Sequence, residues 1–192
     1  MKRALFIVAL VSLVAAGTVQ ANEGIYAGAG FVYNRTQSSD IDFINSATGL
    51  DLKAGYNFGP VALEVNLIGS KHAGRKVGYG DTNFGGMSID LRVPFSQPGQ
   101  PNQFYVLTGL GGYSLKGYDP TAASEVKYSG GGFDLGAGVE HFFNQHLAFN
   151  LAGIYRAIQY DKKEVQGNTV TLSPKINGDI LSVEAGVVYY FK

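Results

Sequence analysis

The stretch that decides the fold is the C-terminal segment Leu181-Ser182-Val183-Glu184-Ala185-Gly186-Val187-Val188-Tyr189-Tyr190-Phe191. Side chains of a β-strand alternate between two faces, so one face here carries Leu, Val, Ala, Val, Tyr and Phe and the other carries Ser, Glu and Gly. One strand of this kind also fits a soluble barrel or sandwich. About eight such apolar faces exceed what one small interior holds, whereas a lipid bilayer covers them all.

Seven further segments of roughly ten residues repeat this alternation and are separated by turn residues, which is typical of a membrane barrel. Their apolar faces are predicted to contact lipid and their polar faces to line the interior. The facing of the segment 103–113 stays open, because Gly109, Gly111 and Gly112 blur the alternation. The predicted strands lie near residues 24–34, 49–58, 61–67, 87–95, 103–113, 132–140, 147–156 and 181–191.

The connections between these segments alternate in length, and this alternation indicates the topology. The links after the second, fourth and sixth segments are short, whereas those at 34–47, 70–85, 114–127 and 158–177 are long. Outer-membrane barrels combine short periplasmic turns with long external loops, and they must close because an open sheet edge in hydrocarbon leaves backbone groups unpaired. The sequence therefore predicts an all-β, eight-stranded antiparallel transmembrane β-barrel with short periplasmic turns and four longer extracellular loops.

The N-terminus predicts export. Lys2 and Arg3 precede an apolar run that ends near Ala16, and Val19-Gln20-Ala21 has small residues where a signal peptidase cleaves. The run is shorter than the roughly 20 residues that a membrane-spanning helix needs. We expect residues 1–21 to be a cleaved signal peptide and residues 22–192 to be an outer-membrane β-barrel domain, located in the cell outer membrane of a Gram-negative bacterium.

Composition argues against several classes of function. Without Lys2 and Arg3 the chain has two more acids than bases, so we expect no nucleic-acid partner. The absence of cysteine excludes a disulfide scaffold and a thiolate metal site. Histidines occur only at His72, His141 and His146, which are too scattered for a metal cluster. We expect no metal and no cofactor.

Catalysis is the least favoured function. A lipid-modifying barrel enzyme needs a base and a nucleophile together near the outer leaflet. The predicted topology puts His141 and His146 at a periplasmic turn, which leaves only His72 beside Ser70 in a long loop. The sequence therefore predicts a protein that is not an enzyme.

Two motifs resemble a known group of proteins. The segment Gly136-Ala137-Gly138-Val139-Glu140 before a short turn and the terminal Val187-Val188-Tyr189-Tyr190-Phe191 resemble the small outer-membrane β-barrel superfamily of opacity proteins and the OmpA transmembrane domain. The resemblance implies the architecture and leaves the function open, because such barrels include adhesins, anchors, narrow pores and a few enzymes. It also implies that the barrel-assembly machinery recognises the C-terminal aromatic strand, although Lys192 follows Phe191 here.

Charged side chains on the inward faces are the main candidates for chemistry. The predicted turns set Lys53 opposite Glu64, with Arg92 at similar depth, and Asp134 opposite Arg156. Charges in a narrow barrel must pair, so the favoured interpretation is a structural polar plug in a barrel with a structural or surface-interaction role. The alternative is a narrow, porin-like pore for protons or small ions, since acids outnumber bases. The predicted network is Asp51, Lys53, Glu64, Asp90, Arg92, Asp134, Glu140, Arg156 and Glu184.

Surface residues predict contacts outside the barrel. Lys71, Arg75 and Lys76 gather in one long loop, where they could meet lipopolysaccharide phosphates or simply be solvated. An extracellular ligand, if there is one, would bind the loops. Two sets of aromatic residues are expected to form the interfacial girdles. They are Phe58, Phe95, Phe104, Phe142 and Phe191 near the short turns, and Tyr33, Phe84, Tyr113, Tyr128 and Tyr155 near the long loops.

Overall fold

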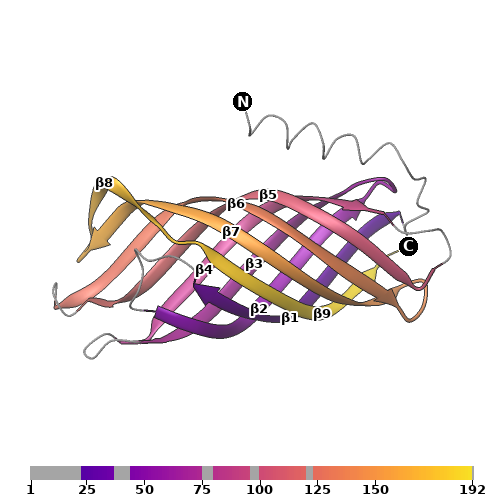
Figure 1. The fold of residues 1–192 in the computed structure, drawn as a ribbon, viewed down its shortest axis with the longest axis horizontal. Helices are drawn as coiled ribbons and strands as arrows, with labels where there is room; N and C mark the ends of the chain where they lie inside the picture. The colour runs from indigo at the N-terminus through magenta and orange to yellow at the C-terminus, as the bar shows by residue number, and fades with distance from the viewer. Residues whose placement is uncertain (1–22, 37–43, 75–79, 96–99, 120–122, 192) are drawn as a thin grey trace.

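A computed structural model describes residues 23–36, 44–74, 80–95, 100–119 and 123–191, so the predicted signal segment lies outside the described residues. Strands make up the regular structure of this part of the chain (Figure 1). No helix in it is long and apolar enough to cross a membrane. The strands are β1 (Gly24–Thr36), β2 (Ile44–Asn57), β3 (Ala62–Gly74), β4 (Thr82–Pro94), β5 (Asn102–Asp119), β6 (Ser124–Phe142), β7 (Leu147–Val165), β8 (Asn168–Asn177) and β9 (Ile180–Tyr190).

The sheet closes on itself. Each strand from β1 to β7 pairs antiparallel with the next, β7 also pairs with β9, and β9 pairs with β1. The result is the predicted eight-stranded antiparallel barrel, formed by β1 to β7 and β9. The remaining strand, β8, pairs with the part of β7 that extends beyond β9.

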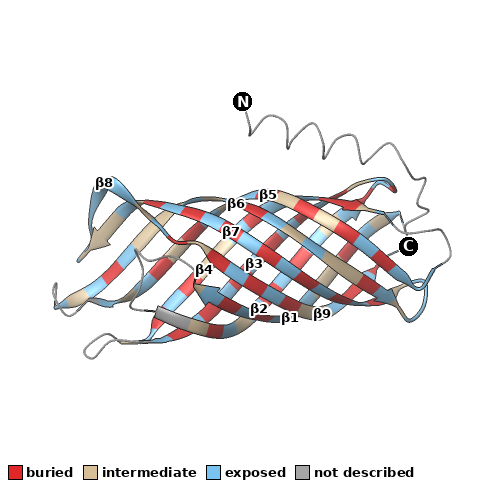
Figure 2. Cartoon of the chain, viewed as in Figure 1, coloured by how far each residue is buried: buried red, intermediate tan, exposed pale blue. Residues whose placement is uncertain are grey.

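Buried and exposed residues alternate along the barrel strands (Figure 2). On β9 the exposed residues are Leu181, Val183, Val187 and Tyr189, as the sequence predicted, and Glu184 is buried. Large apolar residues are exposed around the whole wall, which suits a lipid environment and would be unfavourable in water. They include Phe31, Leu50, Leu52, Leu63, Leu67, Met87, Ile89, Leu110, Phe133, Leu135, Phe149 and Leu151.

The sequence left the facing of β5 open. In the structure its odd-numbered residues face the interior and its even-numbered residues face outward. Tyr105, Leu107 and Tyr113 are buried in the interior, whereas Leu110 is 69% exposed on the outer wall. The apolar pattern failed on this strand because both of its faces carry apolar and glycine residues.

Inward glycines provide space for large side chains from neighbouring strands. A Cβ atom on Gly55 would lie 2.6 Å from the Tyr26 ring, and one on Gly30 would lie 2.7 Å from Asp51 Oδ1. A Cβ on Gly138 would likewise overlap the Tyr105 hydroxyl. These glycines therefore let the tyrosine and charged side chains lie flat against the wall.

The β2–β3 turn sets a register different from the predicted one. The Phe58 amide donates to the Val61 carbonyl at 2.8 Å, and Gly59 has a positive φ of 94°. The turn puts Lys53 opposite Asn66, and Glu64 opposite Gly55, so the predicted Lys53–Glu64 apposition is wrong by two residues. Alternation determines which face a residue occupies, but a slip of two residues preserves the face, and only the turn geometry distinguishes the two registers.

Strand residues fill most of the predicted long loops at 114–127 and 158–177. β5 and β6 continue through most of 114–127, and β7 and β8 form a hairpin within 158–177. Gln166 and Gly167 connect that hairpin with φ values of 50° and 81°, as in a type I′ turn. Figure 1 shows both hairpins projecting from the end of the barrel opposite the short turns. Residues 37–43 and 75–79, in the other two long connections, lie outside the described part.

The aromatic girdles are only partly as predicted. Phe58, Phe95, Phe104 and Phe191 are exposed near the short turns, and Tyr33 and Tyr155 are exposed toward the other end. Phe84 and Tyr113 are instead buried in the interior, so their assignment to a girdle is wrong. Each occupies an inward position, and the outward position next to it is a glycine, Gly85 beside Phe84 and Gly112 beside Tyr113.

Candidate functional site in the barrel interior

Toward the barrel end with the short turns, an ionic cluster surrounds Arg92 of β4. Its guanidinium contacts Glu64 at 3.0 Å and Glu140 at 2.8 Å. Each glutamate also accepts a tyrosine hydroxyl, Glu64 from Tyr26 at 2.9 Å and Glu140 from Tyr190 at 2.7 Å. All five side chains are buried. We call these residues the Arg92 cluster.

Aromatic rings complete the Arg92 cluster. The guanidinium carbon lies 3.9 Å from the centroid of the Tyr105 ring, in a cation–π contact. Asn150 donates to the Tyr105 hydroxyl at 2.7 Å, which fixes that ring. Its two hydrogen-bonding tyrosines, Tyr26 and Tyr190, also pack with Ala62, Ala148, Val188 and partly buried Phe142.

The middle of the barrel holds a second ionic group. Lys53 contacts Glu184 at 3.1 Å and Asp51 at 3.4 Å. Glu184 in turn binds Arg156 at 2.7 Å, and Arg156 approaches Asp134 at 3.7 Å. The predicted cross-strand apposition of Asp134 and Arg156 is confirmed by the β6–β7 register. We call this chain of five residues the midbarrel belt.

Two hydroxyl groups extend the midbarrel belt. Tyr113 donates to the Asp134 carboxylate at 2.6 Å. On β4, Ser88 donates to Asp90 at 2.8 Å, and Oδ1 of Asp90 has no hydrogen-bond partner among the described residues. With Asp90, all nine charged residues of the predicted network are buried in the interior, three cations among six acids.

Above the belt, toward the projecting hairpins, the lumen holds an apolar cluster beside buried polar residues such as Asn34 and Ser70. Val32, Ile68, Phe84, Leu115 and Ile158 are buried together there, and three further residues, Tyr113, Tyr160 and Ile180, complete the cluster. This apolar cap lies toward the projecting hairpins, because its members come from the strand parts farthest from the short turns.

His72 is inside the barrel, and its predicted position in a loop is wrong. It lies on β3 with an exposed fraction of 0% and is 3.3 Å from the Ser70 hydroxyl. Ser70 accepts from Asn34 at 2.8 Å, and Asn34 accepts from Ser182 at 2.5 Å. This polar row crosses β9, β1 and β3 and faces away from lipid. No group of metal-ligating side chains is present among the described residues.

Sequence reasoning missed the buried tyrosines, which bind three of the six inward acids. A signal was available, because Tyr26 and Tyr190 lie out of phase with the lipid-facing residues Ile25 and Tyr189. In the predicted basic loop, Lys71 is exposed at the end of β3 and binds Asp81 at 2.8 Å. Arg75 and Lys76 lie outside the described residues.

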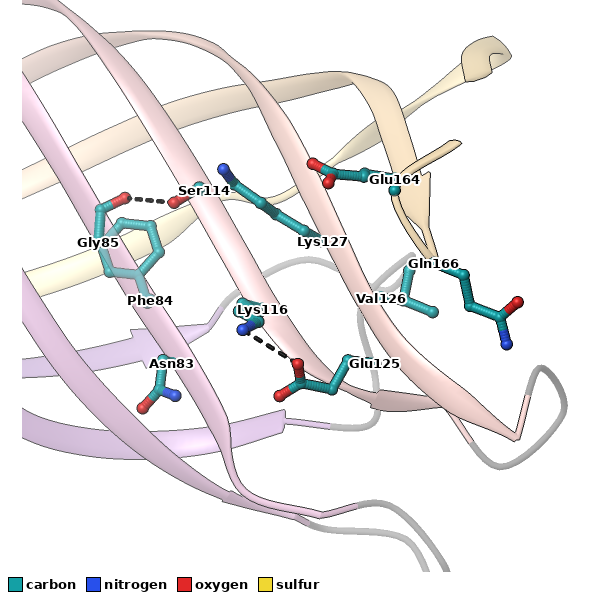
Figure 3. A pocket seen from close by; sticks show the side chains of 11 residues that line it. Asn83, Phe84, Gly85, Ser114, Lys116, Glu125, Val126, Lys127, Glu164 and Gln166 are labelled. Carbon is teal, nitrogen blue, oxygen red and sulfur yellow. Dashed lines mark hydrogen bonds and ion pairs between the residues drawn. The ribbon is translucent and has the colours of Figure 1, made fainter. Parts of the chain in front are cut away.

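The projecting hairpins form an open pocket of about 780 Å³ (Figure 3). In the figure, Lys116 of β5 points toward Glu125 of β6, and Lys127 lies over the pocket near Ser114. The Lys116–Glu125 distance is 3.0 Å. The lining also includes the polar residues Asn83, Glu164 and Gln166 beside the apolar Phe84 and Val126.

A profile of the outer membrane protein beta-barrel domain matches residues 6–191. The chain belongs to this family of outer-membrane β-barrels. The sequence has no match among curated proteins.

Solved structures share the fold at low identity. Neisserial surface protein A is 18% identical with a TM-score of 0.66, over 88% of this chain and 97% of that one. OprG from Pseudomonas aeruginosa is 18% identical with a TM-score of 0.62, over 90% and 99%. Ail, the attachment invasion locus protein of Yersinia pestis, is 16% identical with a TM-score of 0.59, over 88% and 99%. The chain therefore folds as a small outer-membrane barrel.

Proposed function

We propose that the protein is a closed, non-conducting outer-membrane barrel with a structural or surface-interaction role. The observation that carries this proposal is the stacking of three side-chain layers in the lumen: the Arg92 cluster, the midbarrel belt and the apolar cap. An eight-stranded barrel has an interior just wide enough for side chains to fill. Each layer is built from side chains of several strands.

The two ionic layers oppose conduction in a specific way. An ion that passes must displace Arg92 from two carboxylates at once, and then separate Glu184 from both Lys53 and Arg156. Removing one partner of a buried ion pair costs about 3–5 kcal/mol. Ion pairs that depend on both partners to this extent support a plug whose charges hold the strands together.

Surface interaction would be the task of the projecting hairpins. β5–β6 and β7–β8 continue the rigid sheet beyond the barrel, and binding residues usually lie on segments that a rigid scaffold positions. Inside the barrel, the Ser70–His72 pair is buried and cannot reach lipid at the outer wall, which supports a protein that is not an enzyme.

The second candidate function is a narrow cation pore. It is favoured by the excess of acids over bases in the interior and by two carboxylate oxygens, Asp51 Oδ1 and Asp90 Oδ1, that have no hydrogen-bond partner among the described residues. The two functions differ in what passes through the lumen, because a pore must transmit at least small cations.

A flux assay separates the two candidates. Refolded protein is inserted into liposomes that contain a potassium-sensitive dye, and potassium entry is followed after an external step in concentration. The plugged barrel predicts the rate of protein-free liposomes, with a known open porin as the positive control. Entry that scales with the amount of inserted barrel would establish the pore.

A further inference from the structure

A row of polar residues crosses the outer face of the sheet at the base of the projecting hairpins. The register aligns Lys71 with Asn83, Asn83 with Lys116, Lys116 with Lys127, and Lys127 with Glu164. Lys116 and Lys127 are thus directly opposite each other on β5 and β6. Like charges at opposite positions of neighbouring strands are destabilising, so this pair calls for an anion nearby.

The protein supplies only part of that negative charge. Glu125 binds Lys116 at 3.0 Å. Lys127 and Lys162 have no ion pair among the described residues. Both side chains are available for an external anion, although Asp161 and Glu164 lie at the same end of β7 and reduce the local positive charge.

A β-bulge directs Lys162 to the outer face. On β7 the register against β6 shifts between Ser129 and Gly130, so that Asp161 is the extra residue. Tyr160 before the bulge is buried in the interior, and Lys162 after it pairs with Ser129 on the outer face. Without the extra residue Lys162 would face the lumen. Bulges often re-aim a side chain next to a functional site.

Between these lysines the wall is hollow. A second open pocket, about 500 Å³, shares Gly85, Ser114 and Lys127 with the pocket of Figure 3. Two hydroxyl groups face it, from Ser114 and Ser129, which are paired across β5 and β6. Its lower part is lined by glycines, and a Cβ on Gly112 would have no atom within 4 Å. We call this feature the lysine trough, with Lys127 and Lys162 at its rim.

The lysine trough lies directly above the lipid-facing wall. Gly112 pairs with exposed Met87, and the next outward row down holds Ile89, Leu110 and Phe133, all exposed. Along the outer face of adjacent strands, the residues therefore change from apolar to glycine to lysine within about three outward positions. A molecule that fits this order has acyl chains below and an anionic, hydroxyl-rich head above.

We propose that the lysine trough binds the phosphorylated glucosamine head of an outer-leaflet lipopolysaccharide. Lys127 and Lys162 contact a phosphate, the Ser129 hydroxyl donates to one of its oxygens, and the sugar lies over Gly112 and Gly131. Charge-assisted hydrogen bonds of this kind are the stronger ones. The site requires only the membrane position of the barrel and does not depend on whether the lumen conducts.

Native mass spectrometry of the refolded protein in detergent tests this proposal, with diphosphorylated lipid A and its dephosphorylated form as probes. We expect affinity for the diphosphorylated form to fall about tenfold or more in the Lys127→Ala/Lys162→Ala double variant, because two charged contacts are lost. Gly112→Leu should also weaken binding, because its side chain fills the trough without a clash in the folded wall. Heat-dependent gel mobility verifies folding of each variant.

Arg35→Ala is the matched control, because Arg35 is an exposed cation on β1, across the barrel from β5. It should bind as the wild type does. Equal binding of lipid A by the double variant and the wild type would overturn the proposal. Loss of lipid A binding in the presence of equimolar inorganic phosphate would also overturn it, since the site would then be one for free anions.

Discussion

The two ionic layers of the lumen use the same residue types but are connected differently. In the Arg92 cluster a single cation holds two glutamates, and each glutamate also accepts a tyrosine hydroxyl. In the midbarrel belt two cations alternate with three acids along a chain. Arg92 is therefore the hub of the first layer, because two carboxylates depend on this one cation. In the second layer the charges form a linear chain, and the central Glu184 is shared by two cations.

This difference teaches that the effect of a buried charge depends on how many groups rely on it. Loss of the hub leaves two buried carboxylates without a cation, whereas loss of one belt cation leaves a neighbouring cation in contact with Glu184. The Arg92 cluster should therefore dominate both the stability and the closure of the barrel.

The largest effect is expected at the hub. Arg92→Ala should lower the free energy of unfolding by about 3–5 kcal/mol, because Glu64 and Glu140 stay buried without a cation. Urea titrations of refolding in lipid vesicles measure it. Arg92→Lys, which keeps the charge but loses the paired contacts, should lie between this variant and the wild type. A loss below that of Lys53→Ala would contradict the hub.

The next effect concerns the space beneath the hub. Gly55→Ala should cost about 1–3 kcal/mol, because the added methyl overlaps the Leu63 carbonyl oxygen and the Tyr26 ring, and so disturbs the hydrogen bond from Tyr26 to Glu64. Gly153→Ala is the matched control, since a Cβ there has no atom within 4 Å. The same titrations compare the two variants, and equal stability would show that Tyr26 is not held against Gly55.

The belt is tested by a double-mutant cycle on Lys53 and Glu184. The coupling energy should be favourable and between about 0.5 and 3 kcal/mol, as for residues in direct contact. A second cycle on Lys53 and Glu64, which lie two residues out of register, should give a smaller value. A larger coupling energy in the second cycle would instead support the register expected from the sequence, in which Lys53 is opposite Glu64.

The smallest effect is expected at Asp90, which has no ion pair among the described residues. Asp90→Asn keeps an acceptor for Ser88 and removes a buried negative charge, so stability should stay unchanged or rise by about 1 kcal/mol. Destabilisation beyond 1 kcal/mol in the urea titration would mean that the Asp90 charge supports the belt.

Much of the fold could be predicted from the sequence because lipid imposes a strict alternation on every strand. The facing of β9, the strand count and the short turns all follow from it. The β2–β3 register could not be predicted, because Lys53 faces inward whether it is opposite Glu64 or Asn66. The β7–β8 hairpin was missed because it projects beyond the apolar wall, where neither face has to be apolar.

The charged residues of the candidate site could be predicted from the sequence, but most of the contacts between them could not. Charged residues such as Asp51 and Arg156 were identified because they interrupt apolar strands at inward positions. The tyrosine donors were not identified: Tyr113 was assigned to an interfacial girdle, and Tyr26 was not recognised as an inward residue although it lies out of phase with Ile25. Their place depends on inward glycines of neighbouring strands, such as Gly55 beneath Tyr26, and these become neighbours only once the barrel closes.

Single-channel recording in planar bilayers tests the central claim, a lumen closed most firmly at the Arg92 cluster, more directly than any other measurement. The wild type should show no steady conductance, Lys53→Ala at most brief openings, and Arg92→Ala the longest or largest openings. Steady wild-type conductance that Arg92→Ala leaves unchanged would contradict the plug and establish a pore.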